Sequence, residues 1–118
     1  MCGITGVINF DESPVERHIL KNMTDALAHR GPDGEGHWIE GGVGIGHRRL
    51  AILDKSEAGS QPMLSPDSRF VLTFNGEIYN FLDLRLELEK NGFTFRSACD
   101  SEVLLYALIY WGPSAVPK

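Results

Sequence analysis

The pattern of apolar and turn-forming residues in the first half of the chain predicts several strands. Residues 4–10, ITGVINF, are β-branched and apolar and predict a buried strand. Residues 37–40 and 43–47 flank a Gly-Gly pair, which is a two-residue hairpin signal. A further strand is expected over residues 48–53.

A helix is expected between the first strand and the hairpin. Ser13 is the predicted N-cap, Pro14 takes the first helical position and Glu16 completes a capping box. A Gly-Pro pair at residues 31–32 ends the helix. The apolar stripe predicted for this helix consists of Val15, Ile19, Met23 and Leu27.

The second half begins with a polar stretch, residues 54–67, which predicts a long loop. An apolar, β-prone run at residues 70–74 predicts a strand, and residues 75–80 form a connection. Residues 93–96 predict another short strand.

Two further helices are expected. Asn80 is a candidate cap for a helix over residues 81–91, with Gly92 as its stop. Leucine at every second position there leaves a strand open, but Lys, Glu and Leu propensities favour the helix. Residues 102–111 predict a helix ended by a Gly-Pro pair. The mixture is α+β, with strands in excess and mostly antiparallel.

Composition narrows the classes of function. The chain has 118 residues, which suits one domain, and is 42% hydrophobic. Its formal charge of −5 argues against a nucleic-acid partner. No apolar run of 18 residues and no secretory signal is present, so we expect a cytoplasmic protein with no membrane partner. The two cysteines, Cys2 and Cys99, should then be free thiols.

Metal and nucleotide motifs are absent from the sequence. The four histidines and two cysteines do not fall at zinc-ligand spacings, so no metal site is expected. The glycine-rich residues 42–46 lack the spacing of a dinucleotide loop, and no P-loop is present.

Cys2 is a candidate nucleophile. Removal of Met1 would place a thiol and a free α-amine on one residue. In peptides these groups titrate within about one pH unit of each other, so the amine can accept the thiol proton near neutral pH. Many chains begin with Met-Cys by chance, so this feature alone is weak.

Three other positions allow either a functional or a structural interpretation. Asn75 and Gly76 follow an apolar run and could supply two oxyanion donors, or form a simple turn. The basic cluster at residues 47–49 could grip a carboxylate or lie on a solvated edge. Asp100 could pair with an ammonium group, act as a helix N-cap, or do both.

Five blocks in order along the chain resemble the N-terminal glutaminase domain of class II glutamine amidotransferases. They are Met1-Cys2-Gly3-Ile4-Thr5-Gly6, Arg30-Gly31-Pro32-Asp33, His47-Arg48-Arg49-Leu50 with Gln61-Pro62, Asn75-Gly76-Glu77-Ile78-Tyr79-Asn80, and Asp100-Ser101-Glu102. The residues of the third and fourth blocks resemble those of the asparagine synthetase branch. The phosphosugar and phosphoribosyl branches usually show a Thr-Arg element and a His-Asn-Gly turn there.

The resemblance implies a reaction and its catalytic residues. Cys2 would attack the side-chain amide of L-glutamine and form a thioester, with its own amine as base and then as acid. Asn75 and Gly76 would hold the oxyanion. Ammonia would be released and delivered to an acceptor.

The resemblance also implies a glutamine-binding site. Arg49 would bind the substrate carboxylate, and Asp100 with the region around Glu77 would hold its amino end. The backbone wall of the pocket would come from Leu50, Ala51, Ile52 and Leu53. Ala51 and Cys99 stand where a small polar residue is often seen, and we expect little effect from either.

The implied fold is a four-layer α/β/β/α sandwich of the N-terminal nucleophile hydrolase type, here truncated. Residues 1–118 would be the N-terminal part of the amidotransferase domain. The rest of that domain would be absent, as would a synthetase domain that uses ATP and Mg²⁺ to activate aspartate. The glutaminase step itself would need no cofactor. A homodimer is one arrangement the resemblance allows for the full-length enzyme.

Other interpretations remain open. A close relative in this class could transfer nitrogen to a sugar or peptide acceptor instead of aspartate. The chain could also be a non-catalytic fragment of such a domain, or a structural domain that keeps Met1.

Overall fold

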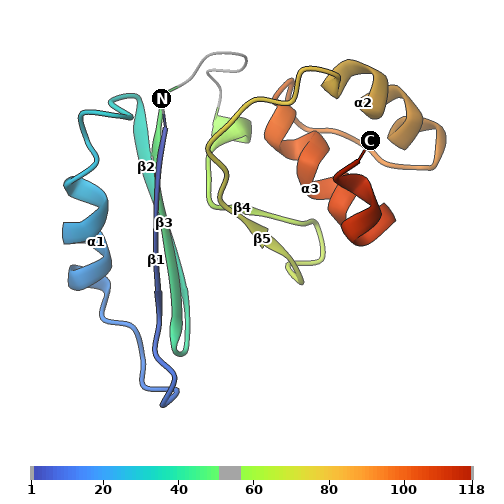
Figure 1. The fold of residues 1–118 in the computed structure, drawn as a ribbon. Coiled ribbons are helices and arrows are strands. Elements are labelled where there is room, and N and C mark those ends of the chain that lie inside the picture. Colours follow the sequence, from blue (N-terminus) through green and yellow to red (C-terminus); the bar gives the residue numbers. More distant parts are fainter. Residues whose placement is uncertain (1, 51–56, 118) are drawn as a thin grey trace. The chain divides into compact units, whose positions relative to one another are not determined.

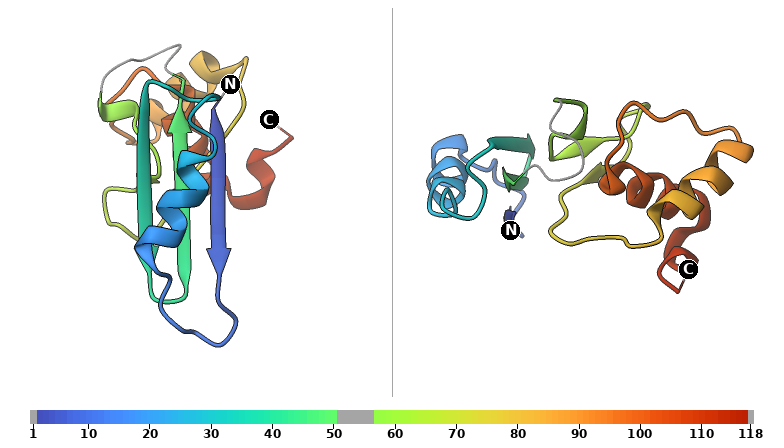
Figure 2. Two further views of the ribbon diagram at one scale, coloured as in Figure 1. Left: turned by 90° about the vertical axis from the view of Figure 1, so that its left-hand side faces the viewer. Right: turned by 90° about the horizontal axis from the view of Figure 1, so that it is seen from above.

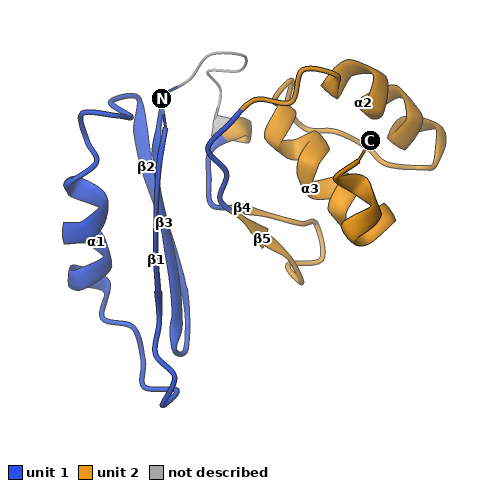
Figure 3. Cartoon of the chain, in the orientation of Figure 1, with its two compact units in different colours: residues 1–52, 60–62, 73–76 blue, residues 53–59, 63–72, 77–118 orange. Residues whose placement is uncertain are grey.

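The computed structural model describes residues 2–50 and 57–117 and confirms the α+β class. Strands outnumber α-helices five to three within these ranges. The chain divides into two compact units (Figure 3). Unit 1 comprises Met1–Ile52, Ser60–Pro62 and Thr73–Gly76, and unit 2 comprises Leu53–Gly59, Met63–Leu72 and Glu77–Lys118.

Unit 1 contains a three-stranded antiparallel sheet, seen edge-on in Figure 1, and its strand order β1-β3-β2 is visible in the left view of Figure 2. The strands are β1 (Gly3–Ile8), β2 (Gly34–Glu40) and β3 (Val43–Arg49). The hairpin is confirmed, and a first strand forms, but it ends at Ile8 and is not buried as predicted: Ile4 is 48% and Ile8 64% exposed. Gly41 in the hairpin turn has φ of 55°, a conformation that favours glycine. Of the strand predicted over residues 48–53, the first two belong to β3, and residues 51–53 lie outside the described residues.

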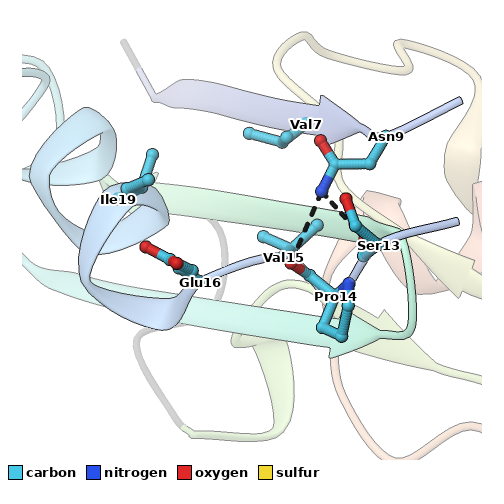
Figure 4. Close-up of a pocket in the computed structure, with 7 residues that line it drawn as sticks. All are labelled: Val7, Asn9, Ser13, Pro14, Val15, Glu16 and Ile19. Atoms are coloured by element: carbon cyan, nitrogen blue, oxygen red, sulfur yellow. Dashed lines mark hydrogen bonds between the residues drawn. The ribbon is translucent and has the colours of Figure 1, made fainter. Parts of the chain in front are cut away.

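The helix of unit 1, α1, covers Arg17–Asp25, so it starts later than predicted and ends well before the Gly-Pro pair at residues 31–32. The N–H and the hydroxyl of Ser13 both donate to Oδ1 of Asp11, at 3.0 and 2.7 Å. Nδ2 of Asn9 donates to the carbonyl oxygen of Ser13 at 2.9 Å (Figure 4). The capping box predicted from Ser13, Pro14 and Glu16 is therefore wrong, because these local bonds hold the segment outside the helix.

The buried face of α1 also differs from the predicted stripe. Leu20 and Thr24 are fully buried, whereas Ile19 is 45% exposed and Met23 37% exposed. The other two members of the predicted stripe lie outside the helix. The stripe prediction is wrong for the helix, because Leu20 and Thr24 are the side chains that lie over Gly44 and Gly46 of β3.

Two glycines of β3 let α1 lie close against one face of the sheet (Figure 2). A Cβ atom on Gly44 would stand 2.9 Å from Cγ1 of Val15. A Cβ atom on Gly46 would overlap the hydroxyl oxygens of Thr5 and Thr24. These hydroxyls lie 3.1 Å apart and hydrogen-bond across the interface. The helix therefore packs almost directly on the β3 backbone.

Unit 2 contains two helices and a small antiparallel ladder. The helices are α2 (Phe81–Lys90) and α3 (Asp100–Trp111), and the ladder pairs β4 (Met63–Leu64) with β5 (Val71–Leu72). Short 3₁₀ turns cover Glu57–Gly59 and Gly112–Ala115. The buried core consists of Met63, Leu88, Val103, Leu105, Tyr106 and Ala107. No helix in the described ranges is long and apolar enough to cross a membrane.

Both helices predicted for this half are confirmed, and the alternative of a strand over the leucines of α2 is not realised. Asn80 stands at the N-cap position, but its side chain makes no capping hydrogen bond, so that prediction is wrong. The strand predicted over residues 70–74 shrinks to β5, and the loop predicted over residues 54–67 contains β4.

The strand predicted over residues 93–96 is wrong. The backbone N–H groups of Arg96 and Ser97 donate to the carboxylate of Glu102, at 2.8 to 3.2 Å, where a strand would need a neighbouring strand. Phe93 and Phe95 pack their rings on Tyr106 of α3, with centroids 5.2 and 5.0 Å away. The apolar residues alternate with polar ones here because both phenylalanines pack on a helix. In sequence, this alternation looks the same as that of a strand.

Replacing Gly46 by Ala should lower the free energy of unfolding by about 2 kcal/mol, because the new methyl group overlaps two threonine hydroxyls under α1. Urea denaturation of the intact protein measures this. Gly6→Ala is the matched control, since a Cβ there meets its nearest atom at 3.8 Å and should change stability by less than about 0.5 kcal/mol. Equal losses in both variants would contradict the packing argument.

Candidate active site

Cys2 lies directly before β1, and its half-buried thiol contacts the backbone of Leu50. The Leu50 N–H points at Sγ with an N···S distance of 3.3 Å, and Sγ lies 3.7 Å from the Leu50 carbonyl oxygen. Leu50 follows the last residue of β3. A backbone N–H aimed at sulfur can donate to a thiolate and fixes where the sulfur stands.

The strand register brings Cys2 next to Arg49. Gly3 pairs with Arg48, so extending the antiparallel register by one residue sets Cys2 opposite Arg49. Side chains alternate between the two faces of a sheet, and α1 covers the glycine-lined face of β3. Cys2, His47 and Arg49 therefore share the other face.

The two arginines of the basic cluster have different partners. Arg48 donates through Nε to the Gly31 carbonyl at 3.0 Å, and its Nη1 lies 3.4 Å from Oε2 of Glu35. Arg49 is half-buried, and its Nη1 lies 3.5 Å from the hydroxyl of Ser60. Arg48 thus has a structural role beside α1, and Arg49 is the arginine on the face of Cys2.

The Arg-Gly-Pro-Asp block holds the backbone around Cys2 and Arg49, a role that sequence reasoning missed. Nε of Arg30 donates to the Cys2 carbonyl at 3.2 Å, and the Asp33 N–H donates to the Arg49 carbonyl at 2.9 Å. A Cβ on Gly31 would overlap the peptide between residues 48 and 49. The glycine of this block was the available signal, since glycine permits such a close backbone approach.

The segment that carries Asn75 and Gly76 also belongs to unit 1. The N–H of Phe74 donates to Oε1 of Gln61 at 2.6 Å, and Nε2 of His47 lies 3.2 Å from the Phe74 carbonyl oxygen. Asn75 is half-buried and Gly76 is exposed.

The remaining predicted site residues lie either in unit 2 or outside the described residues. Glu77, which is exposed, and Asp100, which is buried, belong to unit 2. Oδ2 of Asp100 accepts the Ile78 N–H at 2.9 Å, and Cys99 occupies the N-cap position of α3, so the predicted N-cap role of Asp100 is wrong. Three residues of the predicted pocket wall lie outside the described residues: Ala51, Ile52 and Leu53.

His47 is a buried histidine held neutral by its surroundings. Its side chain is almost fully buried, and burial together with the nearby Arg49 charge lowers its pKa, against the opposing effect of the bond to Phe74. A carbonyl oxygen only accepts, so Nε2 must carry the proton. Within the described residues, Nδ1 has no hydrogen-bond partner.

The pocket found in unit 1 does not include any of the predicted site residues. A pocket of about 240 Å³ in unit 1 opens where the segment before α1 passes β1 (Figure 4). It is lined by Val7, Asn9, Ser13, Pro14, Val15, Glu16 and Ile19, none of which is a predicted site residue. In the described part of the chain, no group of three or more His, Cys, Asp or Glu could hold a metal ion. Both cysteines are free thiols, as predicted.

Comparison with known proteins assigns the chain to a protein family. A family model described as a glutamine amidotransferase domain matches residues 1–118. The chain belongs to this family, in its class II, and is homologous to the N-terminal part of asparagine synthetases.

The individual relatives share about two residues in five with this chain. Asparagine synthetase (glutamine-hydrolyzing) 1 of Bacillus subtilis is 40% identical over 121 residues, covering 100% of this chain and 19% of the relative. Asparagine synthetase (glutamine-hydrolyzing) 3 of the same organism is 43% identical, covering 98% and 19%. A probable asparagine synthetase of Schizosaccharomyces pombe is 42% identical, covering 97% and 20%. The chain thus spans about a fifth of the length of these curated relatives.

Acid should destabilise the protein through His47. Its pKa is lowered on folding, so its contribution to stability is present above the unfolded value of about 6.5 and is lost as pH falls through the lower folded value. Urea denaturation at about pH 7.5 and about pH 5.5 should show a loss on acidification that is smaller in His47→Gln. His18→Gln, at an exposed position, is the control and should keep the wild-type difference. An unchanged difference in His47→Gln would contradict the assignment.

Proposed function

We propose that residues 1–118 are the N-terminal part of a glutaminase domain that hydrolyses glutamine through Cys2. The observation that carries this proposal is the placement of the Cys2 thiol. It is half-buried against the Leu50 N–H, on the same sheet face as Arg49. Membership in the glutamine amidotransferase family supplies the substrate.

The first half of the reaction forms a thioester. The Cys2 thiol passes its proton to the α-amine freed by removal of Met1, and the sulfur attacks the side-chain carbonyl carbon of glutamine. The tetrahedral intermediate carries a negative oxygen, which the Asn75 amide group and the Gly76 N–H would stabilise. The C–N bond then breaks, and the protonated amine donates to the departing ammonia.

The second half regenerates the enzyme. Water attacks the thioester, and the C–S bond breaks to give glutamate and the free thiol. The sum is glutamine plus water giving glutamate plus ammonia. The amine can act again as base toward this water, since it recovers its neutral form when ammonia leaves.

Substrate binding follows from the same residues and from the sequence resemblance. The Arg49 guanidinium can take the substrate carboxylate with two parallel hydrogen bonds. Leu50 would begin the backbone wall, continued by residues 51–53. The resemblance adds Asp100 and Glu77 for the amino end of glutamine, and this part of the proposal comes from sequence alone.

The fate of the ammonia is also proposed from the relatives. Their names support an asparagine synthetase-like ligase, in which ammonia amidates aspartate with ATP and Mg²⁺ bound to a separate synthetase domain. A four-layer α/β/β/α sandwich for the complete domain and a cytoplasmic location belong to the same proposal. Aspartate as acceptor is testable against a sugar or a peptide, by following which of them gains nitrogen from amide-labelled glutamine.

Replacing Cys2 by Ala should abolish glutamine hydrolysis, because the proposed thioester forms on the Cys2 sulfur. We expect a fall of at least about 10⁴-fold in glutamate release by the intact protein. Cys99→Ser, which removes the other thiol, is the matched control and should keep activity within about threefold of wild type.

Hydrolysis that persists in Cys2→Ala would contradict the proposal. Intact mass spectrometry of the active protein checks the proposed base, since Cys2 has a free amine only after loss of Met1. A fully active protein that retains Met1 would show that another group accepts the thiol proton.

A further inference from the structure

We propose that Gln61 and His47 are positioning residues that clamp Phe74 by its backbone N–H and C=O groups and thereby set the oxyanion donors at Asn75 and Gly76. The inference rests on the proposed glutaminase function, which assigns the last two residues. All five residues belong to unit 1. Neither clamping residue would touch the substrate.

The first arm of the clamp is Gln61, fixed by its backbone against β2. A Cβ on Gly36 would overlap the Gln61 carbonyl oxygen and stand 3.1 Å from Cδ of Pro62. The chain at Gln61 therefore lies directly on the strand, where only glycine leaves room. From this fixed point, Oε1 of Gln61 accepts the Phe74 N–H at 2.6 Å.

The second arm of the clamp is His47 on β3. Its register partner on β2 is Gly36, so the two arms start from paired positions on adjacent strands and on the same face. The ring is almost fully buried, and Nε2–H donates to the Phe74 carbonyl oxygen at 3.2 Å. A buried ring with one bonded nitrogen has little freedom to turn away.

The clamp fixes two consecutive peptide planes. The Phe74 N–H belongs to the plane shared with Thr73, and the Phe74 C=O belongs to the plane shared with Asn75. Holding both groups sets φ and ψ of Phe74, so the Cα of Asn75 has a defined position and direction. The Phe74 ring continues this control, since a Cβ on Gly76 would stand 2.9 Å from its Cζ atom.

Such a clamp would act on the rate of the chemical step. An oxyanion donor stabilises the transition state only where it stands within hydrogen-bond reach of the developing charge. Loss of one whole donor costs about 10²- to 10³-fold in kcat, so loosening a support of both donors should cost about 10- to 100-fold. Glutamine binding through Arg49 should change little, because both hydrogen bonds of the clamp go to the Phe74 backbone.

The experiment compares two replacements of Gln61 in the intact protein. Gln61→Met keeps the side-chain length and loses the acceptor, and should lower kcat by about 10- to 100-fold with KM within about threefold. Gln61→Glu keeps an acceptor oxygen and should recover most of kcat. A merely structural role would lower the amount of folded protein or raise KM, and would not separate these two variants.

The second arm has the same test. His47→Gln retains an N–H donor near the position of Nε2 and should stay close to wild-type kcat, while His47→Met should lose kcat with little change in KM. Hydrogen exchange provides a readout that does not depend on activity. The Phe74 amide should be protected in wild type and Gln61→Glu, and should exchange at least about tenfold faster in Gln61→Met.

The outcomes separate the inference from the proposed function. If wild type hydrolyses glutamine and Gln61→Met keeps full kcat, the positioning role is overturned while the glutaminase stands. If wild type does not hydrolyse glutamine, the proposed function fails, and with it the positioning of an oxyanion site. Hydrogen exchange of the Phe74 amide then tests the clamp by itself. Equal exchange rates in Gln61→Met and wild type would show that Gln61 does not hold this amide.

Discussion

The paired strands β2 and β3 are approached closely on both faces of the sheet, and the rest of unit 1 depends on this constraint. On one face, Gly44 and Gly46 leave no side chain, so α1 packs on the strand itself. On the other face, Gly36 of the neighbouring strand admits the chain at Gln61, next to the buried ring of His47. Dense packing on both faces fixes the position of β3. Arg49 and Leu50, at the end of this strand, are therefore fixed as well.

The candidate site is organised mainly through backbone atoms. The Cys2 sulfur meets a backbone N–H, and the Cys2 carbonyl accepts Arg30. The Arg49 carbonyl accepts a backbone N–H, and both polar groups of the Phe74 peptide are bonded. The candidate side chains Cys2 and Arg49 are thus held by groups that bond to their main chain or, for Cys2, to its sulfur. This arrangement suits catalysis, because donors fixed before the reaction need not reorganise during it.

Unit 2 uses a buried carboxylate for a comparable purpose. Glu102 is almost fully buried and accepts the N–H groups of Arg96 and Ser97 and the Ser97 hydroxyl. Burying a carboxylate is costly unless such bonds compensate it, so the loop and the first turn of α3 are tied together. Asp100 in that turn is held in addition by the Ile78 N–H. The Asp-Ser-Glu block therefore has a structural function whatever ligand its aspartate meets.

The sequence by itself determined the hairpin, the three helices as elements, the free thiols and the family blocks, because these follow from local periodicity, turn chemistry and motif wording. Only the tertiary structure decided where the first helix begins and which of its faces is buried, since bonds around Ser13 and the glycines of β3 outweigh local capping. It also decided that residues 93–96 form no strand, since Phe93 and Phe95 pack on Tyr106 of α3 and the Arg96 N–H donates to Glu102. The hydrogen bonds of Arg30 and Gln61 could not be predicted from the sequence either. Each joins a side chain to a backbone group far away along the chain, and only folding brings the two within hydrogen-bond distance.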